Sequence, residues 1–267
     1  MPDLPIFTHW PATRLAIGVA PEACAPALAE ETPLSLRYNT VQYAVMMLTA
    51  QDIEDFCVGF SLTEGIVPQA GAIKSITIET TPTHLIADMR IPAEAFHRLM
   101  QASRRMVVGR TGCGVCGTEE AEQILRPLPM LPPAPPPSLT AIRRGMADLT
   151  AQQSLNRMVR MVHGAAWCAP NGQILCVRED VGRHNALDKL IGARLRGNEN
   201  FTEGFCLLTS RCSYEMVQKA ILAGIHTLVA ISAPTGLALR LAKQAGLTVL
   251  AIARDDAQIL FTGKVAE

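Results

Sequence analysis

The chain has 267 residues, of which 49% are hydrophobic, so it can bury a large core in one domain or in two lobes. Charged residues make up 18% and cancel to zero net charge, which leaves no global field to attract nucleic acid or a membrane surface. The N-terminus lacks the basic region and apolar run of a signal peptide, and no apolar stretch reaches the roughly 18 residues that span a bilayer. We therefore expect a cytoplasmic protein with no nucleic-acid or membrane partner.

The N-terminal part predicts a small α+β lobe. Residues 33–48 read as two short strands around a turn at Asn39, and residues 51–63 carry an apolar stripe at helical spacing. Thr49 and Asp52 resemble a capping box at the start of that helix. A hairpin over 73–79 and 84–90, and then a helix over 93–102, are expected to complete the lobe.

The middle of the chain changes composition twice. Residues 109–117 include four glycines, which makes regular structure unexpected there, and residues 126–138 include seven prolines, which is typical of a stiff linker. The sequence therefore predicts an N-terminal lobe over 1–126, a Pro-rich linker over 127–138 and a second lobe over 139–267.

The C-terminal part predicts repeated strand–helix units after a helical stretch over 139–163. Glycines stand where helices are expected to end, at 197, 224 and 246. This alternation indicates a layered α/β fold whose sheet is largely parallel and covered on its faces. The expected strands are 174–178, 205–209, 227–232, 247–253 and 258–261, and the expected helices are 183–195, 213–223 and 235–245.

Cys113 and Cys116 form the first candidate for chemistry. Two thiols at this spacing can bind a metal, form a disulfide or relay sulfur. A structural zinc site needs about four ligands, and a thioredoxin-like pair opens a helix, which the surrounding glycines oppose. A glycine-framed loop with Arg110 beside the thiols favours sulfur transfer as a persulfide. A zinc site completed by His163, Cys168 and Cys176, a redox role and an incidental pair remain alternatives.

A second candidate is the charged segment 178–189. Asp180, Arg183, His184 and Asn185 surround Gly182 at the carboxyl end of a predicted strand, which is where open α/β sheets place ligands. The alternative is a solvated turn with a helix cap. Lys189, further along the helix, is expected to pair only with an acidic residue on the helix surface.

A third candidate is a set of loops that each follow a predicted strand. If these strands are parallel, the loops lie at one edge, where helix N-termini and arginines suit a phosphate or pyrophosphate. Plain N-capping is the alternative for each loop taken alone. The chain has no P-loop and no G-x-G-x-x-G, so an ordinary NTPase or dinucleotide enzyme is excluded. The residues concerned are Thr209, Ser210, Arg211, Ser232, Thr235 and Arg254.

Several long segments resemble one known family. They are Gly-Arg-Thr-Gly-Cys-Gly-Val-Cys-Gly over 109–117, Glu-Asp-Val-Gly-Arg-His-Asn-Ala-Leu-Asp-Lys over 179–189 and Thr-Ser-Arg-Cys-Ser-Tyr-Glu-Met-Val-Gln-Lys over 209–219, together with 55–65 and 232–235. These are similar to the FdhD family of sulfur carrier proteins that activate formate dehydrogenase, over residues 31 to 263. The resemblance implies a homodimer whose C-terminal domain has a mixed, layered sheet like that of cytidine deaminases. The deaminase zinc motif is absent, which argues against deamination and against a metal site of that kind.

The resemblance also implies roles for particular residues. A cysteine desulfurase would load a persulfide on Cys113, with Cys116 as second thiol. The sulfur would then pass to the molybdenum or tungsten of a bis(molybdopterin guanine dinucleotide) cofactor, which GDP would mimic. The alternative is a cofactor or guanine-nucleotide chaperone without enzyme activity, whose cysteine pair binds metal. The family's cofactor segment corresponds to Ile252, Ala253, Arg254, Asp255, Asp256 and Ala257, in which the two acidic residues depart from the family pattern.

Overall fold

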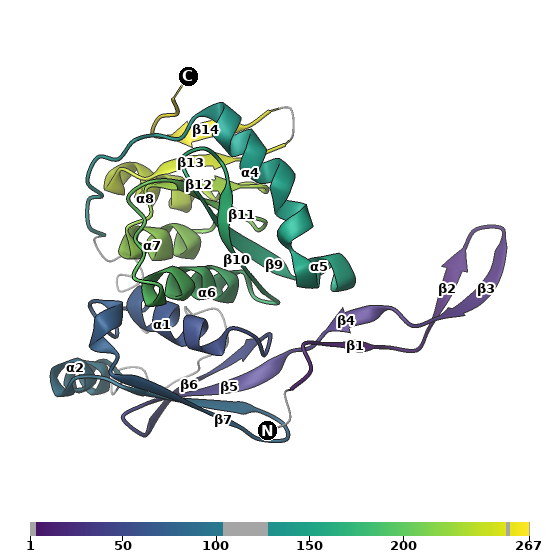
Figure 1. Cartoon of the computed structure of the whole chain (residues 1–267), viewed down its shortest axis with the longest axis horizontal. Coiled ribbons are helices and arrows are strands. Elements are labelled where there is room, and N and C mark those ends of the chain that lie inside the picture. The colour runs from purple at the N-terminus through teal and green to yellow at the C-terminus, as the bar shows by residue number, and fades with distance from the viewer. Residues whose placement is uncertain (1–3, 104–127, 255–256, 267) are drawn as a thin grey trace.

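The computed structural model describes residues 4–103, 128–254 and 257–266 (Figure 1). It contains two larger sheets, one of four strands and one of six, and both carry helices. The mixed α/β class predicted from the sequence is confirmed. Within the described residues, no helix is both long enough and apolar enough to cross a membrane.

The four-stranded sheet forms the N-terminal lobe. Its strands lie in the order β6-β5-β8-β7, with β5 and β8 parallel and the other pairs antiparallel. Alternate residues of β5 are buried, as the period of a half-covered strand requires. The predicted strands, hairpin and helices of this lobe are all present. They are β5 (Thr32–Tyr38), β6 (Val41–Leu48), α1 (Ile53–Thr63), the short η1 (Ala70–Ala72), β7 (Ser75–Thr80), β8 (Leu85–Arg90) and α2 (Ala93–Ser103).

The capping box expected at the start of α1 is wrong. Asp52 precedes the helix in a left-handed conformation (φ 55°), and its side chain makes no capping hydrogen bond. The hydroxyl of Thr49 instead accepts a hydrogen bond from the Val181 N–H in the other lobe, at 3.2 Å. Asp52 lies 3.5 Å from Arg178. Contacts between the lobes therefore replaced the local motif.

The six-stranded sheet forms the second lobe, in the order β10-β9-β11-β12-β13-β14. Only the pairs β11–β12 and β12–β13 are parallel, so the sheet is mixed and the prediction of a largely parallel sheet is wrong. The strands are β9 (His163–Cys168), β10 (Ile174–Asp180), β11 (Phe205–Leu208), β12 (Thr227–Ala230), β13 (Thr248–Ala251) and β14 (Ile259–Thr262).

Helices cover both faces of this sheet. The helices α6 (Arg183–Arg196), α7 (Tyr214–Ala223) and α8 (Gly236–Ala245) share one core with it, in which Trp167 is fully buried. The helix α4 (Leu139–Gln152) packs on the opposite face through Ile142 and Leu149. The result is a three-layer lobe, as Figure 1 shows.

The helical stretch predicted over 139–163 consists of two helices and ends a few residues early. The helix α4 ends at Gln152, the short α5 (Ser154–Val159) follows, and Arg160 turns the chain with a φ of 54°. The chain then enters β9, whose last five residues are all buried. A strand buried on both faces reads as a continuous apolar run, which periodicity cannot separate from a buried helix.

The two lobes meet where α1 crosses α6. The crossing is close because Gly59 and Gly192 lack a side chain: a Cβ on Gly59 would overlap the carbonyl oxygen of Asp188, and one on Gly192 would overlap that of Asp55. Ion pairs surround the crossing. Asp55 lies 2.8 Å from Arg178, and Lys219 lies 2.9 Å from Asp188.

Residues before the N-terminal lobe form a long, two-stranded arm that the sequence did not predict. It projects away from the body in Figure 1. Pairing of β1 (Phe7–His9) with β4 (Ala27–Ala29) forms its base, and pairing of β2 (Ala12–Ala16) with β3 (Val19–Cys24) forms its outer half.

Candidate functional site

The cysteine pair Cys113 and Cys116 lies outside the described residues, and so do Asp255 and Asp256. The structure therefore bears on the other predicted features, which are the charged segment and the strand-end loops of the second lobe.

The remaining cysteines show how the environment controls thiol reactivity. Cys57, Cys168 and Cys212 are buried, and burial raises the pKa of each thiol to about 12. Cys206 is completely buried, and its pKa is raised for the same reason. These four thiols are therefore inert at neutral pH.

Cys176 differs because it is only partly buried. Its Sγ lies 3.5 Å from Nη1 of Arg178, and burial still raises its pKa. The described residues contain no group of three potential metal ligands, so His163, Cys168 and Cys176 do not gather at one point.

The strand-end loops do come together at one edge of the six-stranded sheet. The strands β11, β12 and β13 run parallel, so the loops that follow them leave from the same side. Backbone hydrogen bonds join these loops: the Thr235 N–H donates to the Cys212 carbonyl at 3.1 Å, and the Ile252 N–H donates to the Ser232 carbonyl at 3.3 Å. We call this side the strand-end edge.

Arg254 belongs to the strand-end edge and is held there by backbone oxygens. Its Nη1 donates to the carbonyls of Ile231 at 2.6 Å and Ala253 at 2.9 Å, while its side chain remains exposed. Its own N–H donates to the Ala257 carbonyl at 2.8 Å. Ile252, just before it, takes a positive φ of 52° and so turns the chain at the end of β13. The predicted segment thus presents one exposed guanidinium.

The hydroxyl residues of these loops mainly build the loops themselves. Thr209 accepts a hydrogen bond from the Gly164 N–H at 2.9 Å, and the buried Ser210 donates to the Arg211 carbonyl at 3.1 Å. Thr235 caps α8 by accepting from the Ala238 N–H at 3.3 Å. Plain capping is therefore correct for Thr235. Arg211 is the exposed member of its loop.

The charged segment reaches the same edge because β10, two strands away from β11, runs in the same direction. His184 Nε2 lies 2.8 Å from a carboxylate oxygen of Glu215 at the start of α7, and Arg183 lies 4.0 Å from the same oxygen. Arg183 and His184 therefore join the edge through Glu215.

His163 is a member of this edge that the sequence analysis considered only as a metal ligand. It starts β9 and pairs in register with Asp180. Burial lowers its pKa, and the positive charges of Arg183, His184 and Arg211 lower it further, while Asp180 opposes them. The signal that could have identified it is the antiparallel pairing of β9, which the sequence did not predict.

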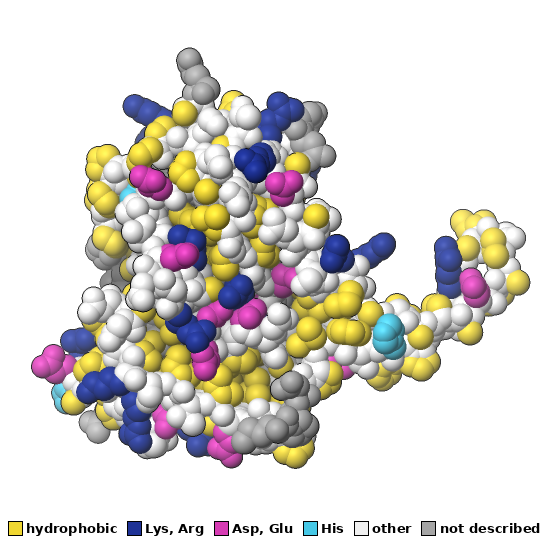
Figure 2. Space-filling model, in the orientation of Figure 1, with side chains coloured by type: hydrophobic (Ala, Val, Ile, Leu, Met, Phe, Trp, Pro, Cys, Tyr) yellow, Lys and Arg dark blue, Asp and Glu magenta, His cyan; other side chains and the backbone are white. Residues whose placement is uncertain are grey.

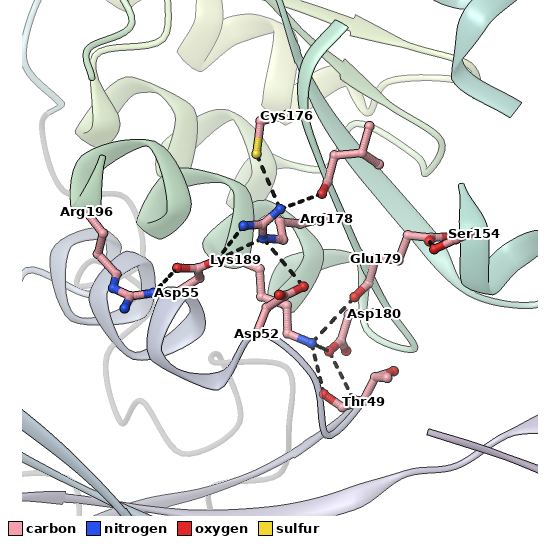
Figure 3. A network of polar contacts seen from close by, with 11 residues as sticks. Thr49, Asp52, Asp55, Ser154, Cys176, Arg178, Glu179, Asp180, Lys189 and Arg196 are labelled. Carbon is pink, nitrogen blue, oxygen red and sulfur yellow. Dashed lines mark hydrogen bonds and ion pairs between the residues drawn. The ribbon is translucent and has the colours of Figure 1, made fainter. Parts of the chain in front are cut away.

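Asn185 turns away from the edge, and Lys189 is not on the helix surface. Asn185 donates to the Met47 carbonyl at 2.8 Å and to Asp180 at 2.9 Å. Lys189 and Asp180 are completely buried and 2.6 Å apart, and Lys189 also donates to the Thr49 carbonyl at 2.9 Å (Figure 3). The expected surface pairing of Lys189 is wrong, because the first lobe covers this side of α6.

The strand-end edge can hold a polyanion. The guanidinium groups of Arg183, Arg211 and Arg254 bring positive charge to it, and α7 and α8 begin there with free backbone N–H groups. Within the described residues, the Ser213 hydroxyl and Arg183 Nε are buried without a hydrogen-bond partner. Such groups are costly to leave unpaired, and phosphate oxygens would satisfy them.

Comparisons with known proteins identify the family of the chain. Residues 29–266 match the model of the FdhD/NarQ family. Proteins named sulfur carrier protein FdhD are 43% identical in Variovorax paradoxus and 46% identical in Xanthomonas euvesicatoria, covering 88% of this chain and 84% and 83% of theirs. A crystal structure of a candidate formate dehydrogenase accessory protein from Desulfotalea psychrophila has the same fold. Its TM-score is 0.76 at 22% identity, over 97% of this chain and 98% of that one. On the extent of these matches, the chain belongs to the FdhD/NarQ family.

Proposed function

We propose that this protein is a sulfur carrier that activates formate dehydrogenase. The observation that carries the proposal is the identity of 43–46% to proteins named sulfur carrier protein FdhD over 88% of the chain, with the Cys113-Gly-Val-Cys116 segment intact. Every other cysteine for which the pKa shifts is made less reactive by burial. Among the described cysteines the one exposed thiol is Cys24 on the arm, and the family resemblance assigns the chemistry to the pair.

In the loading step, the Cys113 thiolate attacks the terminal sulfur of a persulfide on a cysteine desulfurase. The sulfur–sulfur bond of the donor breaks, a new bond forms to Cys113 Sγ, and the desulfurase cysteine leaves as a thiolate. The sulfane sulfur moves without a net change of oxidation state. The attacking thiol must be deprotonated for this step to be fast. Arg110, which is close to Cys113 in the sequence, favours the thiolate.

In the delivery step, Cys116 attacks Sγ of Cys113 and releases the carried sulfur as sulfide. The two thiol sulfurs become a disulfide, so the pair supplies the two electrons that convert sulfane sulfur to sulfide. An external dithiol then reduces the disulfide and resets the carrier. The acceptor is the molybdenum or tungsten of a bis(molybdopterin guanine dinucleotide) cofactor, a cargo rather than a resident group.

The strand-end edge is the proposed place of that cargo. Its arginines and helix N-termini suit the two diphosphates of the cofactor, and the unpaired Ser213 hydroxyl and Arg183 Nε add two donors. Glu215 holds Arg183 and His184 in place and keeps the edge from carrying only positive charge.

Mass spectrometry tests the carrier role. After incubation with a cysteine desulfurase and cysteine, the peptide containing Cys113 should gain the mass of one sulfur. Cys113→Ala should abolish both that gain and the activation of formate dehydrogenase. Cys24→Ala removes an exposed thiol on the arm and is the matched control, which should keep both. Stoichiometric zinc on the pair, with no persulfide, would support the alternative of a metal-binding cofactor chaperone.

Binding of GDP tests the strand-end edge. Calorimetry should show that Arg254→Ala weakens GDP binding by about tenfold, because one charge-assisted hydrogen bond contributes roughly 1.5 kcal/mol or more. Arg98→Ala, which removes an exposed arginine from α2 in the N-terminal lobe, should leave binding unchanged. Equal affinities for the two variants would place the nucleotide elsewhere.

A further inference from the structure

The N-terminal lobe contains a cavity of about 790 Å³, which lies within the range of about 300–1,000 Å³ that is typical of small-molecule sites. The cavity is found where the ends of β5, β7 and β8 meet the helix α2, which Figure 1 shows beside the four-stranded sheet. All of its lining residues belong to this lobe, whereas the strand-end edge belongs to the second lobe. The cavity is therefore separate from the place proposed for the cofactor.

Hydrogen bonds between the strand ends hold the wall of the cavity in place. The Asn39 side chain accepts from the Ile91 N–H at 3.0 Å and donates to the Ile91 carbonyl at 3.2 Å, which ties the end of β5 to the residue after β8. The Lys74 N–H donates to the Arg90 carbonyl at 2.8 Å, which ties the start of β7 to the end of β8. The cavity is therefore preformed, and a ligand need not order its backbone on binding.

One part of the cavity lining is apolar. Phe96 and Met100 stand four residues apart on α2 and so lie on one face of the helix. Both are only partly buried against the core of the lobe, so each keeps apolar surface in the cavity, beside the buried Ile91. Figure 2 shows that hydrophobic side chains also reach the surface elsewhere on the body, so apolar surface alone does not mark a site. A flat or extended apolar group laid on Phe96 and Met100 would be removed from water with them.

The charged groups that line the same cavity are all basic. Lys74 and Arg90 are exposed, and neither makes an ion pair or a side-chain hydrogen bond with another described residue. The imidazole of His97 also lines the cavity, one position after Phe96 on α2. None of the described lining residues is acidic. Two unpaired cations beside an apolar wall favour a ligand that has both an anionic and an apolar part.

We infer that this cavity binds a small phosphate monoester whose alcohol part is an aromatic or aliphatic group. A phosphate monoester carries a charge of about −1.5 to −2 at neutral pH and three acceptor oxygens, which match the two cations and their many N–H donors. A carboxylate has a single charge and would leave one of the cations unpaired. The apolar part lies on Phe96 and Met100, a wall that inorganic phosphate would leave in water.

The shape of the cavity favours a small molecule over a macromolecule. An extended peptide would run along β7, the edge strand of the sheet, but Ser75 is the one residue of β7 that lines the cavity. Nucleic acids and anionic membranes are bound by larger clusters of basic residues, whereas Lys74 and Arg90 are the two fixed cations here. The lining residues instead converge from several segments on one enclosed volume, as they do in small-molecule sites.

Calorimetry of the full chain with naphthyl phosphate tests this inference, which does not depend on the proposed function. The wild type should bind naphthyl phosphate at least about tenfold more tightly than inorganic phosphate or naphthol, because each of these lacks one half of the ligand. The double variant Lys74→Gln/Arg90→Gln should weaken binding at least about 30-fold, because two charge-assisted hydrogen bonds are lost. The matched control Arg98→Gln/Lys264→Gln removes the same two charges from exposed positions outside the cavity and should bind like the wild type.

A further variant separates this cavity from the strand-end edge. Arg254→Ala should bind naphthyl phosphate like the wild type, since Arg254 belongs to the second lobe. Loss of binding in Arg254→Ala, unchanged binding in Lys74→Gln/Arg90→Gln, or an equal loss in the matched control would each overturn the inference. So would equal wild-type affinities for naphthyl phosphate and inorganic phosphate. Binding to phosphatidic acid vesicles without binding of soluble naphthyl phosphate would assign the two cations to a membrane surface and would overturn it as well.

Discussion

The segment 179–189 has a buried polar network on one side and an exposed one on the other. On the inner side, Asp180 and Lys189 are fully buried 2.6 Å apart, and Asp180 accepts further hydrogen bonds from the Thr49 and Gly182 N–H groups at 3.0 and 2.8 Å. On the outer side, Arg183 and His184 share a single carboxylate, that of Glu215, and keep contact with solvent. One short segment thus joins the two lobes on its inner side and offers charges to a ligand on its outer side.

The difference between the two sides teaches which charges are available to a ligand. The inner charges are satisfied by partners and bind the lobes to one another, since Thr49 belongs to the first lobe and Lys189 to the second. Glu179 is satisfied within the second lobe: its carboxylate accepts from the N–H groups of Leu155 and Asn156 at 2.9 and 2.8 Å. The outer side retains unpaired donors, which a ligand can use.

Removing one partner of the buried pair should have the largest effect on stability. Lys189→Met leaves Asp180 charged and buried, so we expect the free energy of unfolding to fall by about 3–5 kcal/mol. Urea unfolding followed by circular dichroism measures this. The control is Glu54→Ala, which breaks a half-exposed pair with Arg196 and should cost at most about 1 kcal/mol. Similar losses for both variants would contradict the distinction between inner and outer charges.

Widening the crossing of α1 and α6 should have a smaller effect. A methyl group at Gly59 meets the backbone of Asp188, so the helices must separate, and we expect Gly59→Ala to cost about 1–3 kcal/mol. Gly71→Ala is the matched control because nothing lies within 4 Å of its Cβ position, and it should change stability by less than about 0.5 kcal/mol. A neutral Gly59→Ala would show that the lobes pack loosely.

Local sequence signals predicted the strands and helices that have a clear period. The helices α7 and α8 and the strands β5 and β8 begin and end close to the predicted positions, because one face of each is buried. The strand β9 was missed because it is buried on both faces and so has no period, and because, unlike the equally buried β12, it does not stand between two helices that have one. The arm was missed because β2 and β3 have no buried face at all.

The candidate site was predictable where it depends on strand direction and not where it depends on side-chain direction. The gathering of the loops after β11, β12 and β13 follows from parallel neighbours. Nothing in the spacing of Arg183, Asn185 and Lys189 tells which of them meets the first lobe. Sequence placed Lys189 on the surface, and only the close crossing of α1 and α6 explains why it is buried.

His163, which pairs with Asp180 beside the segment, should make the stability depend on pH. Burial and nearby positive charges lower the pKa of His163 in the folded protein, so below about pH 6.5 the unfolded chain binds a proton more readily than the folded one. The free energy of unfolding should therefore fall as the pH drops below about 6.5.

In urea unfolding from about pH 8 to 5, His163→Gln should lose less stability than the wild type. His97→Gln, on the exposed surface of α2, should follow the wild type. Bound GDP should flatten the wild-type curve, because a phosphate anion beside His163 favours its protonated form. An identical slope in wild type and His163→Gln would remove His163 from the strand-end edge, and the comparison would then rest on Arg183 and His184 alone.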